Sequence, residues 1–217
     1  MHDTSLLAGS TFSEIYGGPN KIVIDIGGMD VYNCGATLRK FFEEKGMKYI
    51  CVDLEYHSTV DIVVKPGEKL PFDDGSVDLI VSTSCFEHDP CFWLTFKEMC
   101  RIVKVGGYIY VNAPSNGNYH GFPGDNWRFY SDAGQALAYW SGKQISNEKV
   151  YPSIVDETFH ILPLNDIWCD FVCVWKRVDT PDKSILVSDE KIKNVGPFEK
   201  TLTNKGLKLI KKMYRTV

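Results

Sequence analysis

The residues best suited to chemistry begin with two acids and a glycine pair in the first quarter of the chain. Asp25 lies near the end of an apolar run, and Gly27 and Gly28 follow it. Asp53 closes a second apolar run, KYICVD. A glycine turn lets the backbone approach a ligand, and an acid ending the next strand can accept hydrogen bonds from both ribose hydroxyls. The pattern predicts a nucleoside-binding site. The alternative is a tight turn between two strands that happen to end in acids, without a ligand.

A serine and a histidine follow a later apolar run, VDLIVS. Ser84 comes just after this run, where the ligand crevice of an open α/β sheet is expected. His88 lies in the sequence CFEHDP, and a neutral imidazole can accept a proton from a hydroxyl group near pH 7. The sequence therefore offers His88 as a candidate catalytic base. The alternatives are a turn serine and a histidine that caps the following helix.

The segment 118–131, NYHGFPGDNWRFYS, mixes aromatic rings with polar groups. Flat apolar faces beside donors and acceptors suit a sugar ring or another polyhydroxy molecule. A carboxyl group beside an indole ring could also have a raised pKa and act as a base. In the alternative interpretation the aromatic rings hold the loop to the core, and Arg128 pairs with Asp125 or Asp132. The candidate substrate-binding residues are Tyr119, Trp127 and Arg128, and the additional candidate bases are His120 and Asp125.

Metal-ligand spacing gives a weaker signal. Cys85, His88 and Cys91 are three residues apart, and Cys169 and Cys173 are four apart, but structural zinc sites normally show paired C-x2–4-C or H-x3–5-H motifs. We therefore expect free cysteines and no metal site from these residues.

Apolar strand patterns alternate with amphipathic helix patterns along the chain. This alternation predicts a doubly wound, mostly parallel α/β sheet. Gly46 is expected to end the first helix and the pair Gly106-Gly107 the second. The expected strands are 21–26, 49–53, 60–64, 77–82, 108–113 and 168–175, and the expected helices are 36–45, 91–103 and one that starts at 131.

Composition sets broad limits. A chain of 217 residues can bury one full core, so we expect one domain over 1–178 and a lysine-rich extension over 179–217 packed on it. The net charge of −4 gives no general argument for a nucleic-acid or membrane partner. No signal-peptide pattern or long apolar run is present, and the odd number of cysteines favours a reduced, cytoplasmic compartment.

Several phrases together resemble a known family. They are VIDIGG, VDLE, EKLPFDDGSVDLIVSTSCFEH and FKEMCRIVKVGGYIYVNAPSNG. In this order they are similar to the class I S-adenosylmethionine-dependent methyltransferases, particularly the type 11 domains, over about 21–175. The family's first motif is D-x-G-x-G-x-G, and here Met29 and Val31 stand at the later glycine positions. Pro66 stands where the family usually has an acid that contacts adenine.

The resemblance implies a Rossmann-like sheet of about seven strands, with the antiparallel last strand beside the fifth. It also implies S-adenosylmethionine as cofactor and methyl transfer, which we expect to go to a hydroxyl group of a glycan or small molecule. The alternatives are a non-catalytic binding domain with a degenerate cofactor motif, and a nicotinamide-dependent oxidoreductase, which the missing G-x-G-x-x-G disfavours. The implied cofactor-binding residues are Asp25, Gly27, Gly28, Asp53, Leu54, Gly67, Glu68 and Ser84.

Overall fold

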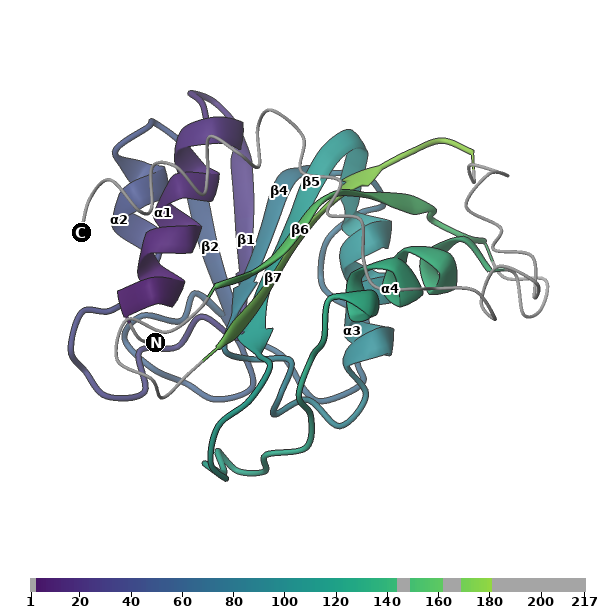
Figure 1. The fold of residues 1–217 in the computed structure, drawn as a ribbon. Helices are drawn as coiled ribbons and strands as arrows, with labels where there is room; N and C mark the ends of the chain where they lie inside the picture. Colours follow the sequence, from purple (N-terminus) through teal and green to yellow (C-terminus); the bar gives the residue numbers. More distant parts are fainter. Residues whose placement is uncertain (1–2, 144–148, 162–168, 181–217) are drawn as a thin grey trace.

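The computed structural model describes residues 3–143, 149–161 and 169–180 and contains one seven-stranded sheet (Figure 1). The strand order is β3-β2-β1-β4-β5-β7-β6. The first five strands in this order run parallel, whereas β7 pairs antiparallel with both β5 and β6. The strands are β1 (Ile22–Ile26), β2 (Lys48–Asp53), β3 (Ile62–Val63), β4 (Val77–Thr83), β5 (Val103–Pro114), β6 (Ser153–Ile161) and β7 (Asp170–Arg177).

Two helical layers cover the sheet, as Figure 1 shows. One core cluster joins one sheet face to α1 and α2 through Phe12 and Phe42, and the other joins the opposite face to α3 and α4 through Phe96 and Leu137. Neighbouring residues of a strand point to opposite faces, so one strand supplies both cores. The helices are α1 (Asp3–Tyr16), α2 (Arg39–Glu43), α3 (Phe92–Ile102) and α4 (Asp132–Gly142).

The doubly wound sheet and the antiparallel strand beside β5 are confirmed, and several details differ from expectation. The sequence did not indicate α1 or β6. The first expected helix is shorter, and Gly46 follows it with φ +72°. The expectation that Gly106-Gly107 ends α3 is wrong: the helix ends at Ile102, and both glycines lie inside β5. A Cβ at Gly107 would lie 2.6 Å from the carbonyl oxygen of Asp78, so this glycine permits close backbone approach.

The expected extension 179–217 lies outside the described residues after position 180. None of the described helices is long and apolar enough to span a membrane.

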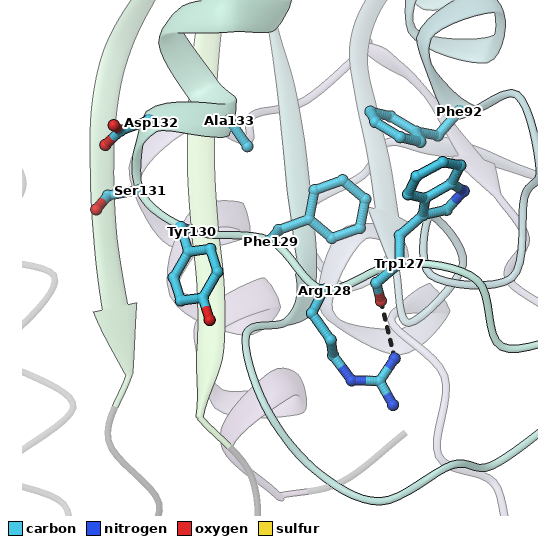
Figure 2. Close-up of a pocket in the computed structure, with 8 residues that line it drawn as sticks. All are labelled: Phe92, Trp127, Arg128, Phe129, Tyr130, Ser131, Asp132 and Ala133. Carbon is cyan, nitrogen blue, oxygen red and sulfur yellow. Dashed lines mark hydrogen bonds between the residues drawn. The ribbon is translucent and has the colours of Figure 1, made fainter.

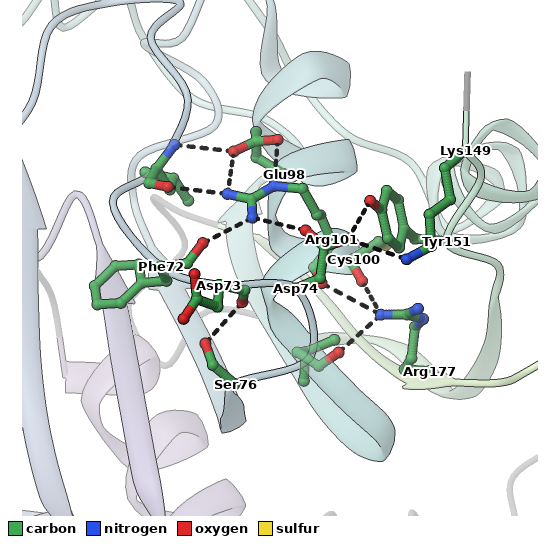
Figure 3. Close-up of polar contacts among 12 residues, drawn as sticks. Phe72, Asp73, Asp74, Ser76, Glu98, Cys100, Arg101, Lys149, Tyr151 and Arg177 are labelled. Atoms are coloured by element: carbon green, nitrogen blue, oxygen red, sulfur yellow. Dashed lines mark hydrogen bonds and ion pairs between the residues drawn. The ribbon is translucent and has the colours of Figure 1, made fainter. Parts of the chain in front are cut away.

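A buried arginine joins two segments of the sequence, LPFDDGS before β4 and RIVK at the end of α3 (Figure 3). The guanidinium of Arg101, on α3, donates to the carbonyl oxygens of Leu70 at 2.9 Å and Phe72 at 2.7 Å. It also donates twice to Glu98, at 2.8 and 2.7 Å, and once to Asp74 at 3.1 Å. One guanidinium thus holds the loop before β4, which contains LPFDDGS, on the RIVK segment of α3 and β5.

Arg101→Lys is expected to lower the free energy of unfolding by about 2–3 kcal/mol, because an ammonium group cannot replace the planar fork and leaves buried acceptors unpaired. Chemical denaturation measures the change. The control is Lys104→Ala, which removes an ion pair of 2.7 Å to Asp78 from a lysine that is 45% exposed. This control should cost under about 1 kcal/mol. Equal losses in the two variants would contradict the structural role of Arg101.

Candidate active site

The carboxyl ends of three neighbouring strands form one edge of the site. Asp53 ends β2, and Gly27 and Ser84 directly follow β1 and β4. Because β1 pairs in parallel with β2 and with β4, these three residues lie at the same edge. The strand order also reverses between β1 and β4, and open α/β sheets bind their ligands in the crevice at such a reversal.

Asp53 joins the turn after β1 to the end of β2. Its Oδ2 accepts a hydrogen bond from the N–H of Met29 at 3.0 Å, and its Oδ1 accepts one from the N–H of Leu54 at 2.7 Å. Burial raises the pKa of this carboxyl, partly offset by the two backbone bonds. A carboxylate offers about four acceptor positions, so about two remain for the hydroxyl groups of a ligand.

Asp25 lies beneath the turn and is only 1% exposed. It accepts a short hydrogen bond from the hydroxyl of Tyr49, and burial raises its pKa to about 7. A Cβ at Gly28 would lie 2.4 Å from Oδ2 of Asp25. Gly28 is therefore required for packing over the acid, and contact of Asp25 with a cofactor stays a prediction.

Gly27 and Ser84 both adopt positive φ values, +74° and +51°. A Cβ at Gly27 would lie 2.3 Å from Sγ of Cys85, so the turn after β1 packs directly against the turn after β4. The N–H of Ser84 donates to the carbonyl oxygen of Asn112 at 3.0 Å, which holds this strained residue at the edge of the sheet.

The other expected cofactor-binding residues are exposed. Leu54 directly follows β2 and is 50% exposed. Gly67 and Glu68 lie in the turn that follows β3, where Gly67 has a φ of +76° and a Cβ on it would meet no atom within 4 Å. Oε1 of Glu68 lies 3.8 Å from Nζ of Lys65. Their contact with a cofactor stays a prediction.

Two candidate bases from separate loops meet around a third residue that sequence reasoning missed. Oε1 of Glu87 lies 3.7 Å from Nε2 of His88 and 3.9 Å from Nε2 of His120. The two imidazole rings stand edge to face, with centroids 5.0 Å apart. Glu87 is 1% exposed, and burial raises its pKa to about 8. The only sequence signal for Glu87 was its position beside His88.

Asp125 corrects one expectation. Its carboxylate accepts two hydrogen bonds from Arg128, at 2.5 and 2.7 Å, and one from the N–H of His120 at 2.9 Å. The guanidinium of Arg128 holds the pKa of Asp125 well below its usual value. The expected raised pKa is therefore wrong, and Asp125 stays ionised as an anchor of the loop instead of serving as a base near neutral pH. The alternative pairing of Arg128 with Asp125 is the one observed.

The loop 118–131 packs on the core and also borders a cavity. The ring of Phe129 is buried and contacts Phe92 edge to face at 4.8 Å. The indole N–H of Trp127 donates to the carbonyl oxygen of Asp89 at 2.9 Å, although the side chain is 38% exposed. Tyr119, by contrast, is 77% exposed and does not line this cavity. The cavity has a volume of about 590 Å³. Its lining residues, drawn in Figure 2, are Phe92, Trp127, Arg128, Phe129, Tyr130, Ser131, Asp132 and Ala133.

Backbone hydrogen bonds connect this loop to the Glu87 cluster. The carbonyl oxygen of Glu87 accepts from the N–H groups of Asn126 at 2.7 Å and Trp127 at 3.2 Å. The aromatic cavity and the two imidazoles are therefore positioned by the same pair of loops, after β4 and after β5.

All seven cysteines lie in the described part of the chain, and all are free. In that part, the one group of three metal-ligating side chains with converging atoms contains no cysteine.

A doubly wound sheet with a crevice at its reversal point defines a nucleotide-type binding fold, and comparisons with known proteins agree. Residues 30–111 match the family model described as "Methyltransferase domain". An uncharacterized methyltransferase of Mycobacterium leprae is 29% identical over 123 residues, 51% of this chain and 44% of that protein. One from Mycobacterium sp. (strain KMS) is 33% identical over 96 residues, 40% and 36% of the two chains. The chain thus spans less than half the length of these relatives.

Solved structures share the fold at low sequence identity. The 1,6-didemethyltoxoflavin-N1-methyltransferase of Burkholderia thailandensis superposes with a TM-score of 0.62 at 12% identity, covering 82% of this chain and 80% of that one. The geranyl diphosphate C-methyltransferase of Streptomyces coelicolor gives 0.56 at 14% identity, covering 79% and 76%. The comparisons therefore support a methyltransferase domain over residues 30–111, within a fold shared with S-adenosylmethionine-dependent methyltransferases.

Asp25 should make the protein less stable as pH rises from about 4 to about 7. Its native pKa of about 7 lies above the value of about 3.9 in an unfolded chain, so in this window the native state holds a proton that the unfolded state has lost. Asp25→Asn should flatten the dependence of unfolding free energy on pH, measured by denaturation at pH 5 to 8. The exposed Asp73→Asn variant is the control, and an unchanged slope for Asp25→Asn would contradict the assignment.

Proposed function

We propose that this protein transfers a methyl group from S-adenosylmethionine to a hydroxyl group of a small molecule or glycan. The observation that carries the proposal is the carboxylate of Asp53, which ends β2, the strand beside β1 at the reversal point, and keeps acceptor positions after its two backbone bonds. The match of residues 30–111 to the methyltransferase family model supports the same cofactor.

The residues at this edge fit the cofactor. Asp53 would accept hydrogen bonds from the ribose hydroxyls, and the backbone of Gly27 would line the methionine end. Leu54 offers an exposed apolar surface directly after β2, which suits the face of the adenine ring. Gly67 and Glu68, in the turn after β3, would border the adenine. When bound, S-adenosylmethionine supplies a methyl group on a positively charged sulfur that is already reactive toward a nucleophile.

The imidazoles favour a hydroxyl acceptor. Attack by a neutral amine uses an available lone pair, whereas a hydroxyl oxygen becomes a good nucleophile only as its proton leaves. His88 and His120 lie together beside the buried Glu87, and either ring could take that proton while the new O–CH₃ bond forms. The relatives compared above include proteins named as N- and C-methyltransferases, so the family alone does not select the oxygen.

The loop 118–131 would bind the acceptor. Its exposed rings, Tyr119 and Trp127, offer flat faces for the C–H groups of a sugar or similar ring. Arg128 would contribute mainly by holding this loop in place, because its guanidinium is engaged with Asp125.

Asp53→Ala should weaken binding of S-adenosylhomocysteine by roughly tenfold or more, because charge-assisted hydrogen bonds of about 1.5–3 kcal/mol are lost. Calorimetric titration measures the change. Glu55→Ala removes an exposed carboxylate two residues away and should bind like the wild type. Equal affinity in all three proteins would contradict the ribose role. Absence of binding by the wild type would favour the scaffold alternative, and binding of NAD instead would favour an oxidoreductase.

His88→Ala or His120→Ala should lower turnover by about 10²–10⁴-fold while leaving affinity for S-adenosylhomocysteine within twofold, because a positioned group that activates the acceptor acts only in the chemical step. Release of S-adenosylhomocysteine with a panel of hydroxylated acceptors measures the rate. Full turnover in both variants would show that alignment of the acceptor alone suffices.

A further inference from the structure

We propose that Glu87, His88 and His120 form a binding site for a divalent transition-metal ion. One ligand atom from each residue converges within 4.8 Å of the other two. The residues come from the loop after β4 and the loop after β5, so spacing along the chain does not reveal the set.

The separations suit an ion better than direct hydrogen bonds. Nε2 of His88 and Nε2 of His120 lie 3.7 and 3.9 Å from Oε1 of Glu87, beyond hydrogen-bonding distance. Two ligands bound to one ion at about 2.0–2.2 Å with near-tetrahedral angles lie roughly 3.3–3.6 Å apart. The two separations from Oε1 exceed this range by only a few tenths of an ångström.

The other nitrogen of each imidazole faces an acceptor, the arrangement expected around a metal-bound histidine. Nδ1 of His88 hydrogen bonds to the carbonyl oxygen of Gly124. Nδ1 of His120 lies 3.2 Å from Oδ2 of Asp125, whose carboxylate is held by Arg128. Proton donation from both Nδ1 atoms would make Nε2 the ligand nitrogen of each ring, and these are the atoms that lie 3.7 and 3.9 Å from Oε1 of Glu87.

The burial of Glu87 is a second, independent observation. Its side chain is 1% exposed, and its Oε2 has no hydrogen-bond partner among the described residues. A buried carboxylate oxygen without a partner is costly, and a bound cation would remove most of that cost. Two imidazoles with one carboxylate suit zinc, manganese or iron(II), whereas magnesium and calcium prefer sites made entirely of oxygen ligands.

The role of the ion rests on the proposed function. Three protein ligands leave coordination positions open, and an acceptor oxygen bound there would have a lowered pKa and lose its proton to water before the O–CH₃ bond forms. The ion would then perform the activation assigned above to a free imidazole, and His88 and His120 would act as its ligands.

Calorimetric titration of chelator-treated protein with zinc chloride tests the site directly. All proteins carry Cys34→Ser and Cys91→Ser, because exposed thiols also bind zinc. This background protein should bind one zinc ion that Glu87→Gln or His120→Gln weakens at least tenfold, and magnesium chloride should bind far more weakly. His57→Gln is the matched control, since His57 lies at the same edge but hydrogen bonds to Thr59 and Asn33. Zinc should also raise the melting temperature of the background protein and of the control more than that of the two ligand variants.

Zinc binding that is absent, or equal in the background protein and His120→Gln, would overturn the proposal. His120 is 38% exposed, so its replacement is compatible with folding, and circular dichroism with S-adenosylhomocysteine titration checks this. The two hypotheses fail separately. Zinc binding without cofactor binding would refute the methyltransferase function but support the metal site. Methyl transfer by chelator-treated protein that binds no zinc would refute the metal site but support the methyltransferase function.

Discussion

The turn after β1 has to pass between the ends of β2 and β4 with almost no free space, and the geometry of the site depends on this packing. Gly27 faces Cys85, Gly28 lies over the carboxyl of Asp25, and the N–H of Met29 bonds to Asp53. At both glycines of the turn a Cβ would lie 2.3 or 2.4 Å from a neighbouring side chain, so neither position has room for one. Met29 and Val31, which stand at the later glycine positions of the motif D-x-G-x-G-x-G, follow this tight passage.

Environment, more than residue type, assigns roles to the acids around this edge. Asp125 and Glu87 belong to two loops in contact, yet their pKa values move in opposite directions. Arg128 bonds to Asp125 through both oxygens and keeps it ionised. Glu87 is buried, and its Oε2 has no donor among the residues that the structure describes, which makes this acid sensitive to any proton or cation that approaches. A buried acid with an unpartnered oxygen beside two imidazoles is a local conflict of the kind that proteins retain at functional sites.

The parallel core was predictable from sequence because its strands are buried on both faces and read as continuous apolar runs. The two elements that the sequence did not predict, α1 and β6, lack such continuous apolar runs. The helix α1 is rich in serine and threonine, and the strand β6, SIVDETFHI, carries two acids. At the site, His88 and His120 were separate hypotheses. Their meeting at Glu87 depends on two loops folding against each other, and no local pattern encodes such a contact. The prediction of a raised pKa for Asp125 was wrong for the same reason, because the contact with Arg128, which lowers this pKa, depends on how the loop folds.

The two halves of the site therefore differ in how they are built. The proposed cofactor half lies on strand ends and a crowded turn within the sheet. The proposed acceptor half lies on loops fixed by a few contacts: the carbonyl oxygen of Glu87, the pair Asp125–Arg128 and the ring of Phe129. Loops of this kind can change without disturbing the sheet, so acceptor identity varies among proteins of one fold. The chemistry particular to this chain accordingly has to be sought in the loops after β4 and β5, where Glu87, His88 and His120 converge.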